Sequence, residues 1–388
     1  MAGIRIAFVT TYDATSPRSY SGVPFHEVPA LERAGASVTL VGSLAPPALP
    51  LSGRARDRLA RRRGLRYLPE RNPGVGRAYA RQVSSRLGAI EVDVILSPGT
   101  IPVAYLDTPL PIAVWADATF AQMIGFNPEF TGLDPASIRE GNAMEAGALS
   151  RASVAAYCSD WAASSAIRDY GTDPAKVMVL AYGANLPAEP DGAWIEAQIT
   201  ARPRGECRLA FLGVDWIQKG GDRALAIAER LTAMGLPTRI TVVGPAAGTV
   251  PRSPLIDNVG FVDKRAPGGQ ERFADLLAAC HLMCLPTRTD CCPIAMCEAS
   301  AYGLPTVSTR VGGVGSVLVE GRNGLLFAEP FDVATAADDI AALMARYDDR
   351  YLPLARASRD EYVSRLNWDT SARTLVERLT EVVESRRR

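Results

Sequence analysis

The chain has 388 residues, of which 47% are apolar and 22% are charged, a composition that fits a globular, soluble protein. Its 42 basic and 42 acidic side chains balance, so no general attraction to nucleic acid is expected. No apolar run reaches the roughly 18 residues that a membrane-spanning helix needs. The N-terminus reads as a first strand rather than a signal peptide, and we therefore expect a cytoplasmic protein.

Apolar runs alternate with helical patterns along the whole chain. In the first half, the runs that read as strands cover residues 4–10, 38–41, 92–97, 112–115, 154–158 and 177–180. In the second half they cover residues 209–212, 239–243, 259–262, 282–285 and 306–309. Continuous Val, Ile and Leu runs separated by helices predict parallel sheets that are buried on both faces. We therefore expect an α/β protein with two doubly wound, Rossmann-like domains.

The domain boundaries follow from composition. Residues 187–208 are rich in proline, glycine and charge, and they read as a linker between a domain at 1–186 and a domain at 209–366. A last helical pattern covers residues 369–388.

One segment of the first domain is strongly basic. Eleven arginines lie between Arg54 and Arg86, and only Asp57 and Glu70 oppose them. Such a run attracts phosphates or anionic membrane surfaces, or it is a solvated, mobile loop. The sequence leaves both interpretations open.

The most informative stretch follows the apolar run at 282–285. Asp290 comes first, Pro293 is placed to begin a helix, and Glu298 lies within that helix. A helix N-terminus offers free N–H groups and the positive end of the helix dipole, so it favours an anion. A diphosphate between two carboxylates that hold hydroxyl groups is the layout that a nucleotide-sugar site needs.

Several motifs accompany these acids in a fixed order. They are Glu298-Ala299, Gly303-Leu304-Pro305, Gly312-Gly313, the run at 321–326 and the upstream run at 211–220 that ends in Lys219-Gly220. Together they resemble the donor-binding signature of family-4 retaining glycosyltransferases of the GT-B fold. The chain departs from that pattern in three ways: Asp290 replaces a usual Glu, Val214 replaces a usual Arg, and Pro293 replaces a usual Gly.

The resemblance implies a GT-B fold, with two Rossmann-like domains that face a cleft, and a last helix that crosses back onto the N-terminal domain. It implies transfer of a sugar from a nucleotide-diphospho-sugar with retention, by same-face substitution, without a metal and without a further cofactor. The acceptor class is a sugar, a cyclitol, or a lipid-linked or natural-product molecule. The donor-binding candidates are Gly22, Lys219, Gly244, Val262, Asp290, Cys292, Pro293, Ile294 and Glu298.

Three of these residues carry proposed roles in the donor site. Lys219 is the cation for the leaving diphosphate, Asp290 accepts hydroxyls of the donor sugar, and Glu298 accepts the ribose hydroxyls. The structural alternatives are an exposed loop lysine, a helix N-cap and an ordinary surface acid, respectively.

In the first domain, Asp117 follows a strand where the resembling family often has a sugar-facing His, and it is the third catalytic candidate beside Lys219 and Asp290. A helix-capping Asp is its alternative. Ser21, His26 and Thr119 are acceptor-side candidates, although a structural role suits His26 better.

Cys291, Cys292 and Cys297 cluster near the proposed site, but small buried side chains explain them better than a metal site, for which His281 lies badly placed. Other classes of function also remain. A pseudo-glycosyltransferase that joins cyclitols, or a sugar-phosphate synthase, would use the same scaffold. A non-catalytic nucleotide-sugar-binding protein would keep the fold without the reaction.

Overall fold

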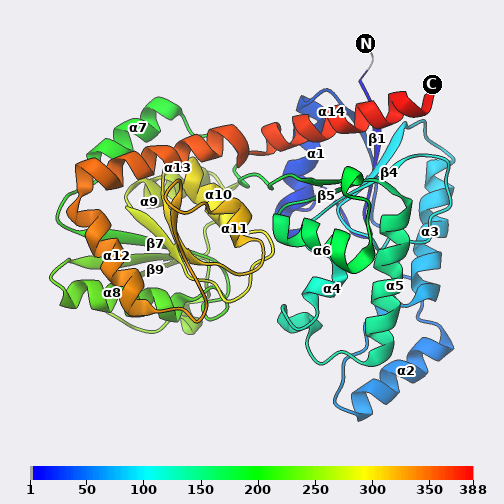
Figure 1. The fold of residues 1–388 in the computed structure, drawn as a ribbon, viewed down its shortest axis with the longest axis horizontal. Coiled ribbons are helices and arrows are strands. Elements are labelled where there is room, and N and C mark those ends of the chain that lie inside the picture. Colours follow the sequence, from blue (N-terminus) through cyan, green and yellow to red (C-terminus); the bar gives the residue numbers. More distant parts are fainter. Residues whose placement is uncertain (1–2, 388) are drawn as a thin grey trace. The chain divides into compact units, whose positions relative to one another are not determined.

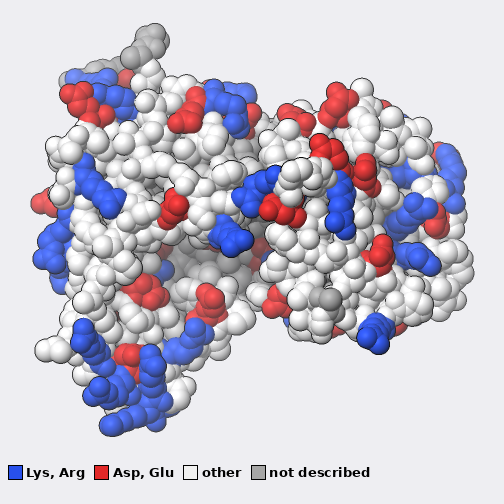
Figure 2. Space-filling view, turned by 180° about the vertical axis from the view of Figure 1, so that it is seen from behind, with Lys and Arg blue, Asp and Glu red and all other residues white. Residues whose placement is uncertain are grey.

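The computed structural model describes residues 3–387, which form two compact units. The first unit comprises the described residues up to Ala181 together with those from Trp368 onward, and the second unit is Tyr182–Asn367. Each unit is built around a six-stranded sheet with helices packed on it (Figure 1). Basic and acidic side chains are interspersed over most of the face seen in Figure 2.

The sheet of the first unit has the strand order β2-β1-β3-β4-β5-β6, and every neighbouring pair is parallel. All six expected strands are present, with ends shifted by one or two residues. Their bounds are β1 Arg5–Val9, β2 Ser37–Val41, β3 Val94–Ser97, β4 Ile112–Ala116, β5 Ala152–Tyr157 and β6 Val177–Val179. The central strands β3 and β4 are buried at every residue, which is why they read as continuous apolar runs.

Helices cover both faces of this sheet (Figure 1). The helices of the whole unit are α1 Val23–Arg33, α2 Leu51–Arg62, α3 Pro73–Leu87, α4 Phe120–Met123, α5 Pro135–Arg151, α6 Asp160–Tyr170 and α14 Trp368–Arg387, with short 3₁₀ turns η1 Ser19–Gly22, η2 Pro69–Arg71, η3 Pro128–Phe130 and η4 Pro174–Lys176. Side-chain caps begin several of them. Asn72 accepts from the N–H of Gly74, and Ser159 accepts from the N–H of Ala162. The arginine-rich segment is therefore largely helical, and of its two interpretations the one as a loop is wrong.

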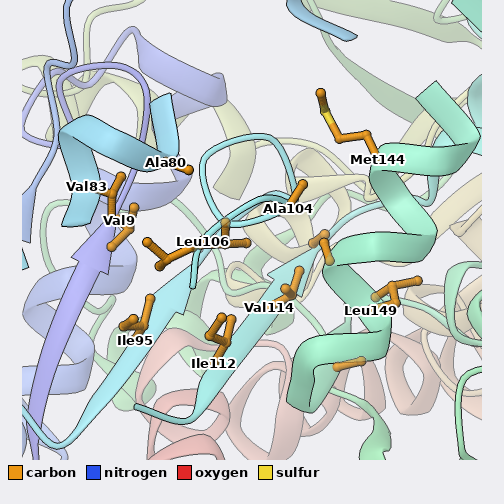
Figure 3. Packing of buried hydrophobic residues seen from close by; sticks show 14 of the residues in the cluster. Val9, Ala80, Val83, Ile95, Ala104, Leu106, Ile112, Val114, Met144 and Leu149 are labelled. Atoms are coloured by element: carbon orange, nitrogen blue, oxygen red, sulfur yellow. The ribbon is translucent and has the colours of Figure 1, made fainter. Parts of the chain in front are cut away.

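The core of the first unit lies between the sheet and helices α3 and α5 (Figure 3). Val9, Ile95 and Val114 come from three adjacent strands and are fully buried. Val83 from α3 and Met144 from α5 close this layer, and both are also fully buried. The site-bearing loops of this unit therefore follow strands that are held rigidly.

The C-terminal helix α14 belongs to the first unit, although the whole second unit precedes it in the sequence. It packs against α1, and the Trp368 ring lies edge-on to the Trp115 ring at 5.7 Å between centroids. Ser371 also donates a hydrogen bond of 2.7 Å to the carbonyl oxygen of Ala181.

The sheet of the second unit has the order β12-β11-β10-β7-β8-β9 and is also parallel throughout. Its strands are β7 Cys207–Leu212, β8 Thr238–Val243, β9 Ile256–Gly260, β10 Leu282–Leu285, β11 Thr306–Thr309 and β12 Gly324–Phe327. The expected strand at 259–262 lies earlier in the chain, at β9. The edge strand β12 was not expected, because it is four residues long and begins at a glycine. A Cβ on Gly324 would lie 1.9 Å from the carbonyl oxygen of Thr306.

The helices of the second unit are α7 Gly192–Ala201, α8 Gly221–Ala233, α9 Gly269–Ala278, α10 Ile294–Ala301, α11 Val314–Val317, α12 Val333–Ala345 and α13 Leu352–Arg365, with short turns η5 Ala247–Thr249 and η6 Tyr347–Tyr351. Among the described residues, no helix combines the length and apolar character required to cross a membrane.

The division between the units differs from the expected linker at 187–208. The chain changes unit between Ala181 and Tyr182, and the expected linker contains α7. Asp191 caps this helix, and Ile195 and Ile199 bury one side of it at a spacing of four residues. Arg202 is buried, and its guanidinium donates to the carbonyl oxygens of Tyr302 and Gly303. The prolines and charges of this stretch are therefore turns and packed contacts of the second unit.

Candidate functional site

Two loops of the second unit are closely joined at the carboxyl ends of neighbouring strands. One connects β7 to α8 and the other connects β10 to α10, and β7 pairs directly with β10. The N–H of Arg288 donates to the carbonyl oxygen of Gln218 at 2.8 Å. Gly220 has a φ of +79°, and a Cβ there would lie 2.0 Å from the carbonyl oxygen of Pro286. Only glycine permits this approach, which explains the Lys219-Gly220 pair of the motif.

The approach of the two loops joins Lys219 to Asp290. The Lys219 Nζ lies 2.6 Å from an Asp290 carboxylate oxygen, and these side chains are 25% and 8% exposed. The Asp290 carbonyl oxygen also accepts a hydrogen bond of 3.0 Å from the N–H of Gly313, so the Gly312-Gly313 turn fixes the loop from a second side. The pair places a cation and a carboxylate side by side at the carboxyl ends of β7 and β10.

Asp290 is not the cap of the following helix, so that alternative is wrong. Helix α10 begins at Ile294, and Pro293 occupies the N-cap position without a side-chain hydrogen bond. The N–H of Ile294 donates to the carbonyl oxygen of Cys292, and the N–H of Met296 donates to that of Pro293. Two of the N–H groups that were expected to be free at this helix N-terminus therefore already have backbone acceptors.

A second lysine–carboxylate pair lies on the same helix. Glu298 is only 8% exposed, and its Oε1 accepts a hydrogen bond from the Nζ of Lys264. Lys264 also donates to the carbonyl oxygen of Asn185 at 2.7 Å, and its Nζ lies 4.9 Å from the centre of the Phe273 ring. These contacts hold Lys264 in place beside the buried Glu298, so Glu298 is not an ordinary surface acid.

Each carboxylate of the candidate site is therefore matched to one lysine. A carboxylate accepts up to about four hydrogen bonds, so a lysine that takes one position leaves acceptor capacity for hydroxyl groups. A lysine ammonium has three donors and tolerates several oxygen partners around it. The arrangement suits a ligand that brings both anionic oxygens and hydroxyl groups.

Glycines and apolar residues after β8 and β9 border the same sheet edge. Gly244 has a φ of +118°, and a Cβ there would lie 2.5 Å from the carbonyl oxygen of Gly213. After β9, Val262 is buried, whereas the Phe261 side chain is 72% exposed. Val214 is 70% exposed on the neighbouring loop, in the position where the resembling signature has an arginine. Because Val214 carries no charge, the cations beside Asp290 and Glu298 are Lys219 and Lys264.

The cysteines near this site do not form a metal centre. Cys291 and Cys292 are half-buried, and the buried Cys297 Sγ lies 3.4 Å from the carbonyl oxygen of Tyr182. In the part of the chain that the structure describes, no group of three His, Cys, Asp or Glu side chains is arranged to hold a metal ion.

His281 is buried and has a structural role. Its Nδ1 accepts a hydrogen bond of 2.9 Å from the N–H of Arg208, and its Nε2 lies 2.8 Å from the carbonyl oxygen of Pro203. Burial lowers the pKa of His281 to about 4, so its imidazole is neutral at neutral pH.

In the first unit, Asp117 follows β4 and pairs with a residue from the β1–α1 loop. The Tyr20 hydroxyl donates to Asp117 Oδ1 at 2.5 Å. Burial, followed by the Asp117 charge, holds the pKa of Tyr20 well above its usual value, so the hydroxyl keeps its proton. The N-cap of α4 is Thr119 rather than Asp117, and the capping alternative for Asp117 is therefore wrong.

The loop that carries Tyr20 has an unusual backbone. Tyr20 and Ser21 have φ values of +47° and +55°, and Gly22 follows with +79° as the N-cap of α1. Left-handed backbone costs a non-glycine residue about 1–2 kcal/mol, so neighbouring contacts must compensate for it. The Tyr20 ring stacks on the Tyr12 ring at 6.2 Å, and its hydroxyl binds Asp117.

The other acceptor-side candidates differ from one another. Ser21 is exposed beside Gly22, and His26 is half-buried on α1 with its ring edge-on to Phe25 at 5.2 Å. Thr119 is fully buried, and its hydroxyl lies 2.6 Å from that of Ser165. Thr119 is therefore better explained by packing than by contact with an acceptor.

Sequence reasoning did not predict the contact of Lys264 with Glu298, and it did not single out Tyr20. Lys264 is 34 positions from Glu298, and Tyr20 is 97 positions from Asp117. Lys264 lies in the loop that follows strand β9, and Tyr20 lies between strand β1 and helix α1. Polar residues at such strand ends were the available signal, because these ends gather at one edge of a parallel sheet.

The family match to known proteins lies entirely within the second unit. Residues 206–346 match the family model described as glycosyl transferases group 1. A D-inositol 3-phosphate glycosyltransferase from Rhodococcus erythropolis is 30% identical over 227 residues, which cover 54% of this chain and 49% of that protein. One from Catenulispora acidiphila is 28% identical over 231 residues, covering 55% and 52%. The chain thus aligns with about half the length of these relatives.

Solved structures agree with the fold along nearly the whole chain. A sucrose-phosphate synthase from Thermosynechococcus elongatus superposes with a TM-score of 0.68 at 15% identity, covering 98% of this chain and all of that one. WaaG, a glycosyltransferase involved in lipopolysaccharide biosynthesis, gives 0.60 at 16% identity, with 97% and 100% coverage. The Anabaena protein HepE in complex with UDP gives 0.62 at 16% identity, with 98% and 100% coverage. The expected GT-B fold and the resemblance to glycosyltransferases are confirmed.

Proposed function

We propose that this protein is a retaining glycosyltransferase that moves a sugar from a nucleotide-diphospho-sugar to a hydroxylated acceptor. The observation that carries the proposal is the pair of lysine–carboxylate contacts around α10, Lys219 with Asp290 and Lys264 with Glu298. The glycosyl transferases group 1 match over residues 206–346 includes all four side chains.

The bond that breaks joins the anomeric carbon to a phosphate oxygen, so negative charge grows on the diphosphate. Lys219 is proposed to meet that charge, because its ammonium is held at the sheet edge and is a quarter exposed. The dipole of α10 adds to the same effect. A fixed cation takes the place of a divalent ion in this proposal, and the reaction runs without metal.

The two carboxylates are proposed to hold the hydroxyl groups at the two ends of the donor. Glu298 accepts the ribose hydroxyls while Lys264 holds it in place. Asp290 accepts hydroxyls of the sugar, and its contact with Lys219 couples sugar position to diphosphate position. Gly244 and Val262 border the position proposed for the base.

Retention is proposed to follow same-face substitution. The acceptor oxygen attacks the face that the diphosphate leaves, the bond to the anomeric carbon forms as the bond to phosphate breaks, and a phosphate oxygen takes the acceptor proton. Asp117 is proposed to accept a hydroxyl of the reacting sugar. No protein nucleophile takes part.

The acceptor proposed is a sugar or a cyclitol. The relatives are named for inositol 3-phosphate, and this naming supports a small polyhydroxylated acceptor. No observation favours the pseudo-glycosyltransferase or the sugar-phosphate synthase over the glycosyltransferase, because the structural similarity to a sucrose-phosphate synthase concerns the fold alone.

A nucleotide screen with one site variant tests the proposal. UDP, GDP, ADP and CDP are each added at saturating concentration, and thermal unfolding is followed. A ligand at one hundred times its dissociation constant adds about 2.7 kcal/mol of stability. Glu298→Gln keeps the size of the side chain and an acceptor for Lys264, and it should weaken the best nucleotide by about 1.5–3 kcal/mol. Glu229→Gln, at an exposed position of α8, is the matched control.

Unchanged nucleotide affinity in a folded Glu298→Gln variant would remove Glu298 from the site. With the nucleotide known, turnover of the corresponding nucleotide sugar should survive excess EDTA. Loss of turnover that magnesium or manganese restores would show that the metal-free mechanism is wrong.

A further inference from the structure

The helix α2 carries a concentration of positive charge that the proposed reaction does not use. Residues 51–66 contain seven arginines and one acid, Asp57, whereas the whole chain has equal numbers of basic and acidic side chains. The charge excess is therefore local to this helix and the turn that follows it.

The inner side of α2 is defined by its buried residues. Gly53 and Ala60 are buried, and Ala60 packs with Tyr67 and Ala136 in a small apolar cluster. A Cβ on Gly53 would lie 3.3 Å from the side-chain nitrogen of Asn72, so this side of the helix lies close to the start of α3. At 3.6 residues per turn, the opposite side carries the exposed residues Leu51, Ala55, Arg58 and Arg62.

Four arginines of this region are bound within the first unit. Arg54 donates to the carbonyl oxygen of Leu49, and Arg66 donates to that of Pro128. The other two pair with acids, Arg56 with Glu140 and Arg61 with Asp57. Arg56 and Arg66 thereby tie this region to distant parts of the unit, whereas the contacts of Arg54 and Arg61 are local to the helix.

The side chains of Arg58, Arg62 and Arg63, in contrast, point into solvent. They are exposed, and no described residue forms a hydrogen bond or an ion pair with their side chains. Arg58 and Arg62 are four positions apart on one helix face, a spacing at which like charges destabilise a helix. Figure 2 shows Lys and Arg side chains gathered at the lower left edge of the molecule, where the lower right of Figure 1 places α2.

Apolar side chains lie among these cations. Leu51 is 82% exposed at the start of α2, and Leu59 is 48% exposed two turns later. A surface that binds phosphates in solution needs only the cations, whereas a lipid surface also receives apolar side chains below its headgroups. The long stem of an arginine suits the same boundary, because it lies in the apolar layer while its guanidinium reaches the phosphates.

We propose that the exposed surface of α2 and of its C-cap residue, formed by Leu51, Arg58, Leu59, Arg62 and Arg63, docks on an anionic lipid bilayer. Phosphate groups there pair with the three arginines and relieve the repulsion between them, and the leucines enter the interface. This docking is independent of the proposed sugar transfer and does not require α2 to touch either substrate.

Vesicle co-sedimentation of the full chain tests the docking. The probes are vesicles of phosphatidylcholine alone and vesicles that also contain 30% phosphatidylglycerol, each at low and high salt. We expect binding to the anionic vesicles only, and its loss at about 0.5 M salt, where exposed charges are strongly screened. The triple variant Arg58→Gln/Arg62→Gln/Arg63→Gln should bind about two orders of magnitude more weakly.

A matched control removes the same charge elsewhere. Arg239, Arg252 and Arg272 are exposed in the second unit, and Arg239→Gln/Arg252→Gln/Arg272→Gln should bind anionic vesicles like the wild type. Leu51→Ser/Leu59→Ser should weaken binding to the anionic vesicles at low salt, although it removes no charge. Circular dichroism and thermal unfolding verify that each variant is folded.

Three results would overturn the docking. The first is no binding to anionic vesicles, or equal binding to neutral ones. The second is an equal loss in both triple variants, which would show an effect of overall charge. The third is binding of a soluble polyglutamate as tight as that of the anionic vesicles, with no effect of the leucine changes, which would identify an acidic protein as the partner.

Discussion

The contact between Tyr20 and Asp117 gives the sharpest test at the scale of single residues. Asp117→Asn keeps the size of the side chain and its ability to accept from Tyr20, but it removes the charge. If Asp117 acts on the reacting sugar, turnover should fall by about two orders of magnitude. Tyr20→Phe removes a hydrogen bond to a charged group, so turnover should fall by about tenfold or more. Steady-state rates on the nucleotide sugar identified by the screen measure both effects.

Asp107→Asn, at an exposed position of the same unit, is the control for loss of one charge. Normal turnover in a folded Asp117→Asn variant would leave Asp117 as a structural residue. Attention would then move to Ser21 and His26, which lie on the same β1–α1 segment.

The sequence was informative about single residues where a motif fixes their chemistry, and less so where partners are distant. Asp290 and Glu298 were chosen from their spacing around a predicted helix start, and Lys219 was chosen from the resemblance to the glycosyltransferase signature. Their pairing was not predicted, because it depends on the approach of two loops that are 71 positions apart. The contact of Lys264 with Glu298 was not predicted for the same reason, since the sequence around a lysine that follows a strand does not show which acid it contacts.

At the scale of elements, the glycine between Lys219 and α8 controls how closely the two site loops approach. Gly220→Ala would place a Cβ 2.0 Å from the carbonyl oxygen of Pro286 at a φ of +79°. Backbone strain and the steric clash together should lower the free energy of unfolding of the second unit by about 2–5 kcal/mol. Urea unfolding measures the loss, and nucleotide affinity should fall with it because Lys219 is displaced.

Gly235→Ala separates the two causes. Gly235 has a φ of +89°, but a Cβ there meets no atom within 4 Å. It should therefore cost only the backbone strain, about 1–2 kcal/mol, with nucleotide affinity unchanged. Equal effects of the two substitutions would show that loop approach at Gly220 is unimportant.

Most elements were predictable, because a buried parallel strand reads as an uninterrupted apolar run. Strands β10 and β11 were expected with the bounds that the structure has. Two elements were missed for physical reasons. Strand β12 is a short edge strand that begins at Gly324, and α7 lies between prolines and charges that resemble a linker. The sequence did not show whether the arginine-rich segment is a helix or a loop. Its helix α2 buries only Gly53 and Ala60, so it lacks the apolar stripe by which a helix is recognised.

At the scale of the whole molecule, the chain returns to its first unit only at its end. Helix α14 begins at Trp368 and buries an apolar side that includes Leu375 and Leu379. This side packs on α1, and Trp368 lies against Trp115 of β4. The first unit therefore depends on residues that follow the complete second unit in the sequence.

Deletion of residues 368–388 tests this dependence. Each large apolar side chain that loses its burial costs about 1.5–3 kcal/mol, and several are lost together, which approaches the 5–15 kcal/mol that stabilises a typical domain. We expect strands β1 to β6 to lose protection in hydrogen-exchange mass spectrometry, while β7 to β12 keep theirs. Deletion of residues 386–388 alone is the control, because the described part of that end contributes only exposed arginine contacts, from Arg386 to Pro109 and Ser153 and from Arg387 to Asp93. Full protection of the first unit without α14 would show that α1 and the sheet are stable by themselves, and that the return of the chain is not needed to fold the unit.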